Sequence, residues 1–235
     1  MSKLVPCSLI AVVSLAAAAV ALGASEATTF SADQTARAEG ASTGLKFNLA
    51  FADEAAPDAL PSGLRTFKVK LHRGARFDGR GATQCRVTDD ELTQEGVDAC
   101  PPASRIGSGR ATATTAAGQT VEPEAVIFNQ LVGRRQAFLF LFVLNDTVAA
   151  AFDAFIKDGT ISSQGLSGVL PGDFVVTKFS GTIEKHSKGR GKRRRNLITS
   201  PDVCPRGRRE WVAKGTFTFQ NGDKDTASST SPCRP

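Results

Sequence analysis

The sequence has few of the residues on which catalytic and metal sites are commonly built. It contains only two histidines, His72 and His186. We expect both at the surface, because His72 falls on the polar side of an alternating run and His186 lies in a charged segment. A catalytic triad or a histidine metal site needs partners that this count does not supply. We therefore predict a protein that is not an enzyme and has no catalytic residues, no metal and no cofactor.

The cysteines also lack the spacing of a zinc site. Four follow the N-terminal segment, and no two of them have the two-to-four-residue spacing of a zinc knuckle. An even count in an exported chain indicates two disulfides, for which three pairings are possible. We favour the sequence-local pairing, because each bond then closes a loop between neighbouring segments: Cys85 with Cys100, and Cys204 with Cys233.

The one long apolar run lies at the N-terminus. Lys3 precedes an uncharged stretch over 4–22, and small residues follow around 23–27. A positive start, an apolar stretch and a small-residue cleavage site are the parts of a secretory signal peptide. We predict a signal peptide over 1–24, with an uncleaved membrane anchor as the alternative. The protein is then secreted or associated with the cell envelope, outside the cytoplasm.

Short apolar runs separated by Gly, Pro, Asn and Asp dominate the rest of the chain, which is typical of an all-β protein. The segment 25–43 has no periodicity, and we predict it to be flexible. The fold class is a single antiparallel β-sandwich-like domain over 44–235, stabilised by disulfides and containing at most one short helix. The predicted strands are 45–51, 67–71, 126–131, 136–144, 174–183 and 211–219, with a hairpin turn at Asn221-Gly222 and a helix over 89–99 that begins with a capping box at Thr88 and Glu91.

The stretch 137–144 has no polar face, so it must be covered on both sides. One interpretation is a central strand with the core on one face and a helix or second layer on the other. The alternative is an apolar groove that carries a hydrophobic ligand.

Two cysteine-containing segments resemble a known group of proteins. The first is Cys100-Pro-Pro-Ala-Ser-Arg-Ile-Gly-Ser-Gly-Arg-Ala, preceded by Cys85. The second has a Pro-x-x-Cys-Pro segment, a Trp, an alternating strand, a Gly-containing turn and a final Cys, matched by Pro201, Cys204, Pro205, Trp211, Phe217, Phe219, Gly222 and Cys233. The chain thus resembles uncharacterised secreted proteins of high-GC Gram-positive bacteria over about 45–235. The resemblance implies an exported β-sandwich-like domain and no particular activity.

Three short patterns suggest chemistry, and each has a simpler explanation. The string 40–44 matches a nucleophile elbow but lacks the strand and helix that strain the serine. The acidic run 89–91 is explained by the dipole of the predicted helix. Asn221, Asp223 and Asp225 alternate as calcium ligands do, but Thr226 stands where a calcium loop needs glycine, so we expect a solvated hairpin.

The basic residues are concentrated in one region. Of the 28 that follow Lys3, ten lie in 185–209 with only one of the 23 acidic residues, Asp202, so the remainder has 18 basic against 22 acidic residues. Glycine interleaving indicates a mobile basic loop over 185–200 between two strands. The loop has no aromatic residue that could stack on bases, which argues against sequence-specific nucleic-acid binding.

We therefore predict an exported non-catalytic module, acting at the cell envelope or extracellularly, that docks on anionic envelope polymers or membrane head groups through the basic loop. An inert solvated insertion is the alternative for the loop. A carrier of a hydrophobic ligand is the second function considered, and a secreted hydrolase is the third. The predicted polyanion-binding residues are Lys185, Lys188, Arg190, Lys192, Arg193, Arg194, Arg195, Arg206, Arg208 and Arg209.

Overall fold

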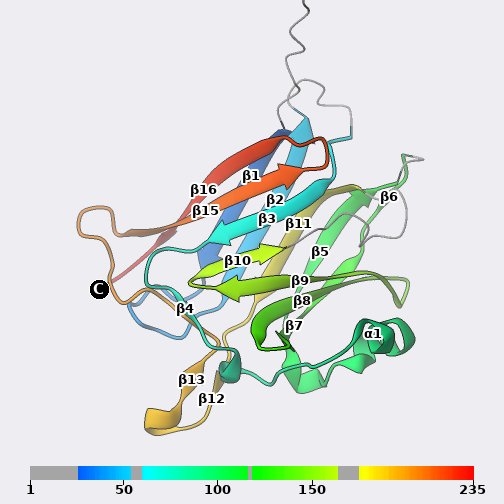
Figure 1. The fold of residues 1–235 in the computed structure, drawn as a ribbon. Helices are drawn as coiled ribbons and strands as arrows, with labels where there is room; N and C mark the ends of the chain where they lie inside the picture. Colours follow the sequence, from blue (N-terminus) through cyan, green and yellow to red (C-terminus); the bar gives the residue numbers. More distant parts are fainter. Residues whose placement is uncertain (1–25, 54–59, 116–117, 164–174) are drawn as a thin grey trace, which may run out of the picture.

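The computed structural model describes residues 26–53, 60–115, 118–163 and 175–235, so the predicted signal peptide over 1–24 and the predicted strand start at 174 lie outside the described residues (Figure 1). No helix in this part of the chain is long and apolar enough to cross a membrane. The helical segments of the described part are α1 (Asp89–Glu95) and four short 3-10 helices, η1 (Gly79–Gly81), η2 (Gly96–Ala99), η3 (Pro102–Ser104) and η4 (Gly191–Arg193). The strands are β1 (Glu26–Gln34), β2 (Leu45–Asp53), β3 (Leu64–Lys70), β4 (Arg76–Phe77), β5 (Arg105–Thr114), β6 (Thr120–Val121), β7 (Glu124–Val132), β8 (Arg135–Leu144), β9 (Thr147–Lys157), β10 (Thr160–Ser163), β11 (Val175–Ile183), β12 (Ser187–Lys188), β13 (Arg195–Asn196), β14 (Ile198–Thr199), β15 (Glu210–Phe219) and β16 (Lys224–Pro232).

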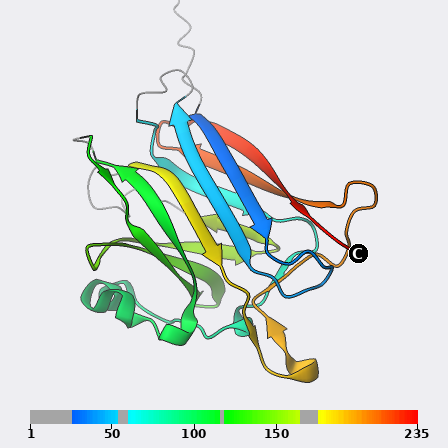
Figure 2. The ribbon, with the colours of Figure 1, turned by 180° about the vertical axis from the view of Figure 1, so that it is seen from behind.

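Most strands belong to one antiparallel sheet in the order β1-β2-β11-β5-β7-β8-β9-β10-β3-β15-β16, with β6 paired to β5. The sheet curls until its first and last strands lie side by side, so it is nearly closed into a barrel (Figures 1 and 2). Two small two-stranded sheets, β12-β13 and β14-β4, lie outside it. The predicted all-β, antiparallel domain with one short α-helix is confirmed.

The closing contact between β1 and β16 uses side chains in place of a backbone ladder. In each of three hydrogen bonds, the donor on β1 and the acceptor on β16 are 197 residues apart in sequence. Because this separation stays constant along the strands, the two strands run parallel. The hydroxyl of Ser231 also donates to the carbonyl of Ala32. Three backbone N–H groups of β1 donate to β16: Thr28 to Asp225 Oδ2 (2.7 Å), Ala32 to Ser229 Oγ (3.1 Å) and Gln34 to Ser231 Oγ (3.3 Å).

Phenylalanine rings fill the interior of the curled sheet. Phe140 stacks on Phe152 with ring centroids 4.9 Å apart, and Phe47 contacts Phe140 and Phe179 edge-on or tilted. Gly181 leaves room for the Phe47 ring, because a Cβ atom there would lie 2.6 Å from Phe47 Cζ. The fully or mostly buried rings of this core are Phe30, Phe51, Phe138, Phe140, Phe142, Phe179, Phe217 and Phe219.

The apolar stretch 137–144 forms β8, and the chain itself covers both faces of this strand. Phe138, Phe140 and Phe142 point into the interior. Leu139 and Leu141 point outward into a second buried cluster with Leu92 of α1 and the first disulfide. The covering layer that this run requires is therefore the segment 85–100.

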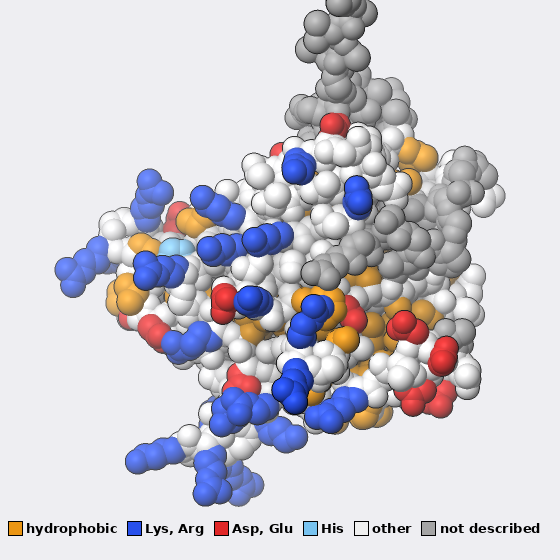
Figure 3. Space-filling model, in the orientation of Figure 1, with side chains coloured by type: hydrophobic (Ala, Val, Ile, Leu, Met, Phe, Trp, Pro, Cys, Tyr) orange, Lys and Arg blue, Asp and Glu red, His pale blue; other side chains and the backbone are white. Residues whose placement is uncertain are grey.

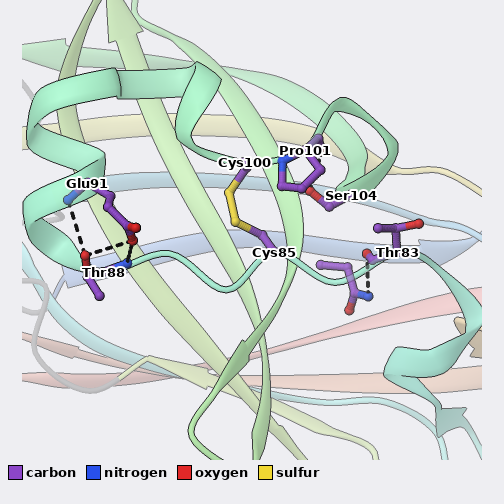
Figure 4. Close-up of a disulfide and its surroundings, with 8 residues drawn as sticks. Thr83, Cys85, Thr88, Glu91, Cys100, Pro101 and Ser104 are labelled. Carbon is purple, nitrogen blue, oxygen red and sulfur yellow. Dashed lines mark hydrogen bonds between the residues drawn. A yellow bond between two sulfur atoms is a disulfide. The ribbon is translucent and has the colours of Figure 1, made fainter.

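The disulfide between Cys85 and Cys100 ties the two ends of this covering segment together (Figure 4), with Cα atoms 5.3 Å apart. The predicted capping box is present between them: the N–H of Glu91 donates to Thr88 Oγ1 (3.3 Å), and the N–H of Thr88 donates to Glu91 Oε2 (2.8 Å). The second predicted bond, Cys204–Cys233, also forms. Both pairs follow the sequence-local pairing.

The structure differs from the prediction at the N-terminal segment 25–43. Residues 26–34 form β1, paired with β2 over its whole length, and Phe30 and Ala32 are buried. Phe30 packs edge-on against Phe217, with ring centroids 5.7 Å apart. Its ladder partner β2 is near in sequence, but the contacts with Phe217 and Ser229 come from β15 and β16, which are distant in sequence.

The seam between β1 and β16 generates a stability prediction. Ser229→Ala removes the acceptor of the Ala32 N–H and leaves a buried donor without a partner, which costs about 1–3 kcal/mol. We expect a loss of that size in the free energy of unfolding, measured by urea denaturation. Ser228→Ala, at the exposed neighbouring position, is the matched control and should change stability by less than about 0.5 kcal/mol. Equal stability of the two variants would contradict the role of the serine in closing the sheet.

Candidate functional site

The predicted basic loop is an ordered hairpin that projects from one end of the barrel (Figure 1). Ser187 pairs with Asn196 and Lys188 pairs with Arg195 across β12 and β13. The tip is a single 3-10 turn in which the N–H groups of Arg193 and Arg194 donate to the carbonyls of Arg190 and Gly191, each over 3.1 Å. The prediction was a loop between two strands, and the structure places two short strands and a turn within it. We call residues 185–195 the basic hairpin.

The base of the hairpin is fixed to the domain by buried backbone. Leu197 is fully buried; its N–H donates to the carbonyl of His186 (3.0 Å), and its carbonyl accepts from the N–H of Asp78 (3.0 Å). Gly81 makes this approach possible, because a Cβ atom there would lie 2.2 Å from the Leu197 nitrogen. The hairpin therefore projects from a rigid support.

Arg195 has a structural partner. Its guanidinium lies 2.9 Å from Asp78 Oδ2, and Arg80 binds the other oxygen of the same carboxylate at 2.9 Å. Partial burial opposes ionisation of Asp78, but hydrogen bonds from Arg80 and Arg195 outweigh it and hold the pKa of this carboxyl below its usual value. Arg195 thus secures the base of the hairpin.

The remaining cations of the hairpin are exposed and largely uncompensated. Arg194 makes one long hydrogen bond, to Ser187 Oγ (3.4 Å). The side chains of Lys188, Arg190, Lys192 and Arg193 make no hydrogen bond or ion pair with the described residues. A dense group of such cations on a preformed support can bind an anionic polymer without first being ordered.

Arg206, Arg208 and Arg209 lie apart from the hairpin, in the exposed turn that precedes β15. The ribbon views show the hairpin and this turn pointing in different directions (Figures 1 and 2). Trp211 packs on the Cys204–Cys233 disulfide beneath the turn and donates from Nε1 to the carbonyl of Val203 (3.1 Å). The ten predicted residues therefore form two separate basic projections.

Acidic side chains gather elsewhere, over the covering segment. Figure 3 shows Asp and Glu side chains grouped around α1, away from the basic hairpin. On the face shown, the acidic side chains around α1 are therefore separated from the basic hairpin. The exposed acidic residues of this segment are Asp89, Asp90, Glu91, Glu95 and Asp98.

The other sequence patterns take structural roles. Ser42 lies between β1 and β2, in an isolated bridge with Thr199, and a strand follows it where a nucleophile elbow needs a helix. Asn221 hydrogen-bonds to Asp223 within the β15–β16 turn, as a turn residue does. Among the described residues no group of three or more His, Cys, Asp or Glu side chains is placed to hold a metal ion.

The two histidines lie in different surroundings. His72 Nδ1 accepts the backbone N–H of Val212 (3.1 Å), which requires that nitrogen to be unprotonated. Burial lowers the pKa of His72 from its ordinary value. His186 is half-buried at the base of the hairpin.

Among the carboxyl groups of the described residues, Asp153 has the largest shift in pKa. It lies on the outer face of β9, opposite Leu139 of β8. Burial raises the pKa of Asp153 to about 6, Asp89 adds to the increase, and Arg135 opposes it. Arg135 also lies over the ring of Phe155, 3.5 Å from its centroid. The sequence gave no indication of this group, because it depends on the covering segment.

No protein-family model and no curated protein sequence matches this chain. A solved structure described as "AvmM Catalyzes Macrocyclization in Alchivemycin A Biosynthesis" is similar over 90% of this chain and 91% of that chain, with 8% sequence identity and a TM-score of 0.22. A similarity at this level carries no argument about the function of this chain.

Asp153 generates a prediction about pH. A carboxyl with a raised pKa holds its proton more tightly in the folded state than in the unfolded chain, so stability is lost as the pH rises from about 4 to 6. Asp153→Asn keeps the site neutral and should raise the free energy of unfolding near pH 8 by on the order of 1 kcal/mol, a value reduced for the remaining solvent exposure. Near pH 4 the gain should be much smaller. Urea unfolding at the two pH values measures both.

Asp158→Asn, which removes a carboxylate from the exposed β9–β10 turn, is the matched control. An Asp153→Asn variant that lost stability equally at both pH values would contradict the assignment.

Proposed function

We propose that this chain is an exported, non-catalytic β module that docks on anionic polymers of the cell envelope or its surroundings through the basic hairpin. The observation that carries the proposal is the set of exposed cations at the hairpin tip that have no ion-pair partner among the described residues. Counterion release from a charged polymer is the physical source of affinity for such a group. The turn that carries Arg206, Arg208 and Arg209 adds a second point of contact in this proposal.

Two further features support the proposal. Both disulfides are consistent with an oxidising, extracytoplasmic compartment, and the apolar N-terminus has the order of a secretory signal. The acidic side around α1 lies away from the basic hairpin (Figure 3), so an anionic surface would orient the molecule with the hairpin toward it.

The test is a variant that removes cations from the tip of the hairpin and keeps the contacts at its base. Lys192→Ser, Arg193→Ser and Arg194→Ser together remove three tip cations and leave the Arg195–Asp78 pair in place. Binding to a teichoic-type polyphosphate polymer, measured by calorimetry over a range of salt concentrations, should weaken sharply. The slope of log K against log salt should fall by roughly two, given about 0.7 ions released per neutralised charge on a single strand. Thermal stability should change by less than about 0.5 kcal/mol.

The matched control removes three exposed cations from β2, β5 and β11: Lys46→Ser, Arg110→Ser and Lys178→Ser. The net charge of the two variants is the same. Equal loss of binding in both would mean that overall charge, not the hairpin, drives the interaction. Anionic vesicles in a parallel measurement distinguish a lipid surface from a soluble polymer.

A further inference from the structure

A second cation-bearing surface covers the outer face of β10, β3, β15 and β16. Ile161, Val69 and Phe217 point into the core, so the residues that alternate with them on these strands point outward. Most of these outward residues are lysine, threonine or serine, and the exceptions are Glu210, Val212 and Pro232 at one end of β15 and β16. Figure 3 shows this wall of the molecule, where Lys and Arg side chains stand apart from one another on a surface of other side chains and backbone.

Strand register arranges these side chains in rows that run across the sheet. Neighbouring strands are about 4.8 Å apart, so successive members of a row are close neighbours. The first row is Lys157, Thr160, Lys70, Lys214 and Ser228. The second row is Ser162, Lys68, Thr216 and Thr226. We call these nine residues the lysine–hydroxyl face.

The fold leaves these charges uncompensated. Neither row contains a carboxylate, and none of the nine side chains makes a hydrogen bond or ion pair with the described residues. Lys70 and Lys214 are direct cross-strand partners, and like charges in that position destabilise a sheet. Lysine on an edge strand can protect against aggregation, but β3 and β15 are both paired on two sides. Neither the stability of the sheet nor the protection of an exposed edge therefore explains this pair.

We propose that the lysine–hydroxyl face binds an acidic polysaccharide whose charged groups are carboxylates. The ammonium groups of Lys70 and Lys214 lie on adjacent strands and can share one carboxylate, which removes their mutual repulsion. Thr160 and Thr216 present hydroxyls beside the lysines, and a hydroxyl both donates to and accepts from the hydroxyls of a sugar. Rows that contain both cations and hydroxyls on a pleated surface fit an extended polymer that carries carboxylates and hydroxyls.

The chemistry of the face favours a polysaccharide over other polyanions. A polyphosphate could accept hydrogen bonds from the hydroxyls, but it has no hydroxyl group along its chain to donate in return, so only a sugar uses the hydroxyls as both donors and acceptors. A single-stranded nucleic acid would gain from aromatic stacking, and the nine residues include no aromatic. Phe155, which borders the second row on β9, lies beneath Arg135. The binding face also shares no residue with the basic hairpin, so the inference does not depend on the proposed docking function.

The experiment measures binding of a polygalacturonate oligomer in the hairpin-neutralised background, Lys192→Ser, Arg193→Ser and Arg194→Ser. Two further variants are added to it. Lys70→Ser with Lys214→Ser should lower the affinity about five- to tenfold, as expected for the loss of two exposed ion pairs. Thr160→Val with Thr216→Val keeps the branched shape suited to a strand while removing two hydroxyls, and it should lower the affinity for polygalacturonate more than the affinity for linear polyphosphate.

The matched control is Lys46→Ser with Lys178→Ser, two exposed strand lysines on β2 and β11. It should change the affinity less than twofold. Equal losses from the two lysine pairs would overturn the proposal, because binding would then follow net charge. An unchanged affinity in the threonine variant would overturn the polysaccharide assignment and leave a polyphosphate as the better ligand. Thermal unfolding of each variant confirms that the sheet is intact, and removal of the lysine pair should not lower the melting temperature.

Discussion

Closure of the sheet between β1 and β16 is the contact on which the rest of the structure depends. Without it the phenylalanine interior would be open to water along one side, from Phe30 to Phe217. Serine and aspartate side chains make the closure. Their oxygen atoms, from β16, accept hydrogen bonds from the backbone N–H groups of β1. Next to this seam, β15 pairs with β3, and their register places Lys70 opposite Lys214.

The division of charge follows from the same architecture. The covering segment that protects the outer face of β8 carries the acidic residues of α1, where the helix dipole favours them at the first turn. The basic hairpin is anchored at a different place, through buried Leu197 and its close approach to Gly81. Since each group is attached to its own buried support, the molecule can present cations to a partner without repacking its core.

Much of the fold could be predicted from local pattern. Alternation over 45–51 and 67–71, the capping box at Thr88 and the Asn221-Gly222 turn all correspond to observed elements. The strands β9 and β10 were missed, although their turns carry usable signals. Asn145, Asp146 and Asp158 adopt positive φ in two-residue turns, as type I′ hairpins require. The run of small residues at the start of β9 obscured the alternation that would have supported them.

The candidate sites were predictable only in part. The basic composition of 185–195 is visible in the sequence, but its anchorage by Leu197 and the engagement of Arg195 with Asp78 depend on contacts across more than a hundred residues. The lysine–hydroxyl face is less visible still. Lys68 and Lys70 read as the ordinary polar side of one strand, and only pairing with β15 and β10 shows that they continue into rows.

The parallel seam also has a consequence for how the chain folds. The hairpins from β7 through β10 connect neighbours in sequence and can form early, whereas the seam joins segments 197 residues apart. Contacts of such long range are entropically costly to form first, so closure comes last. The chain consequently cannot complete its core until its final strand is available.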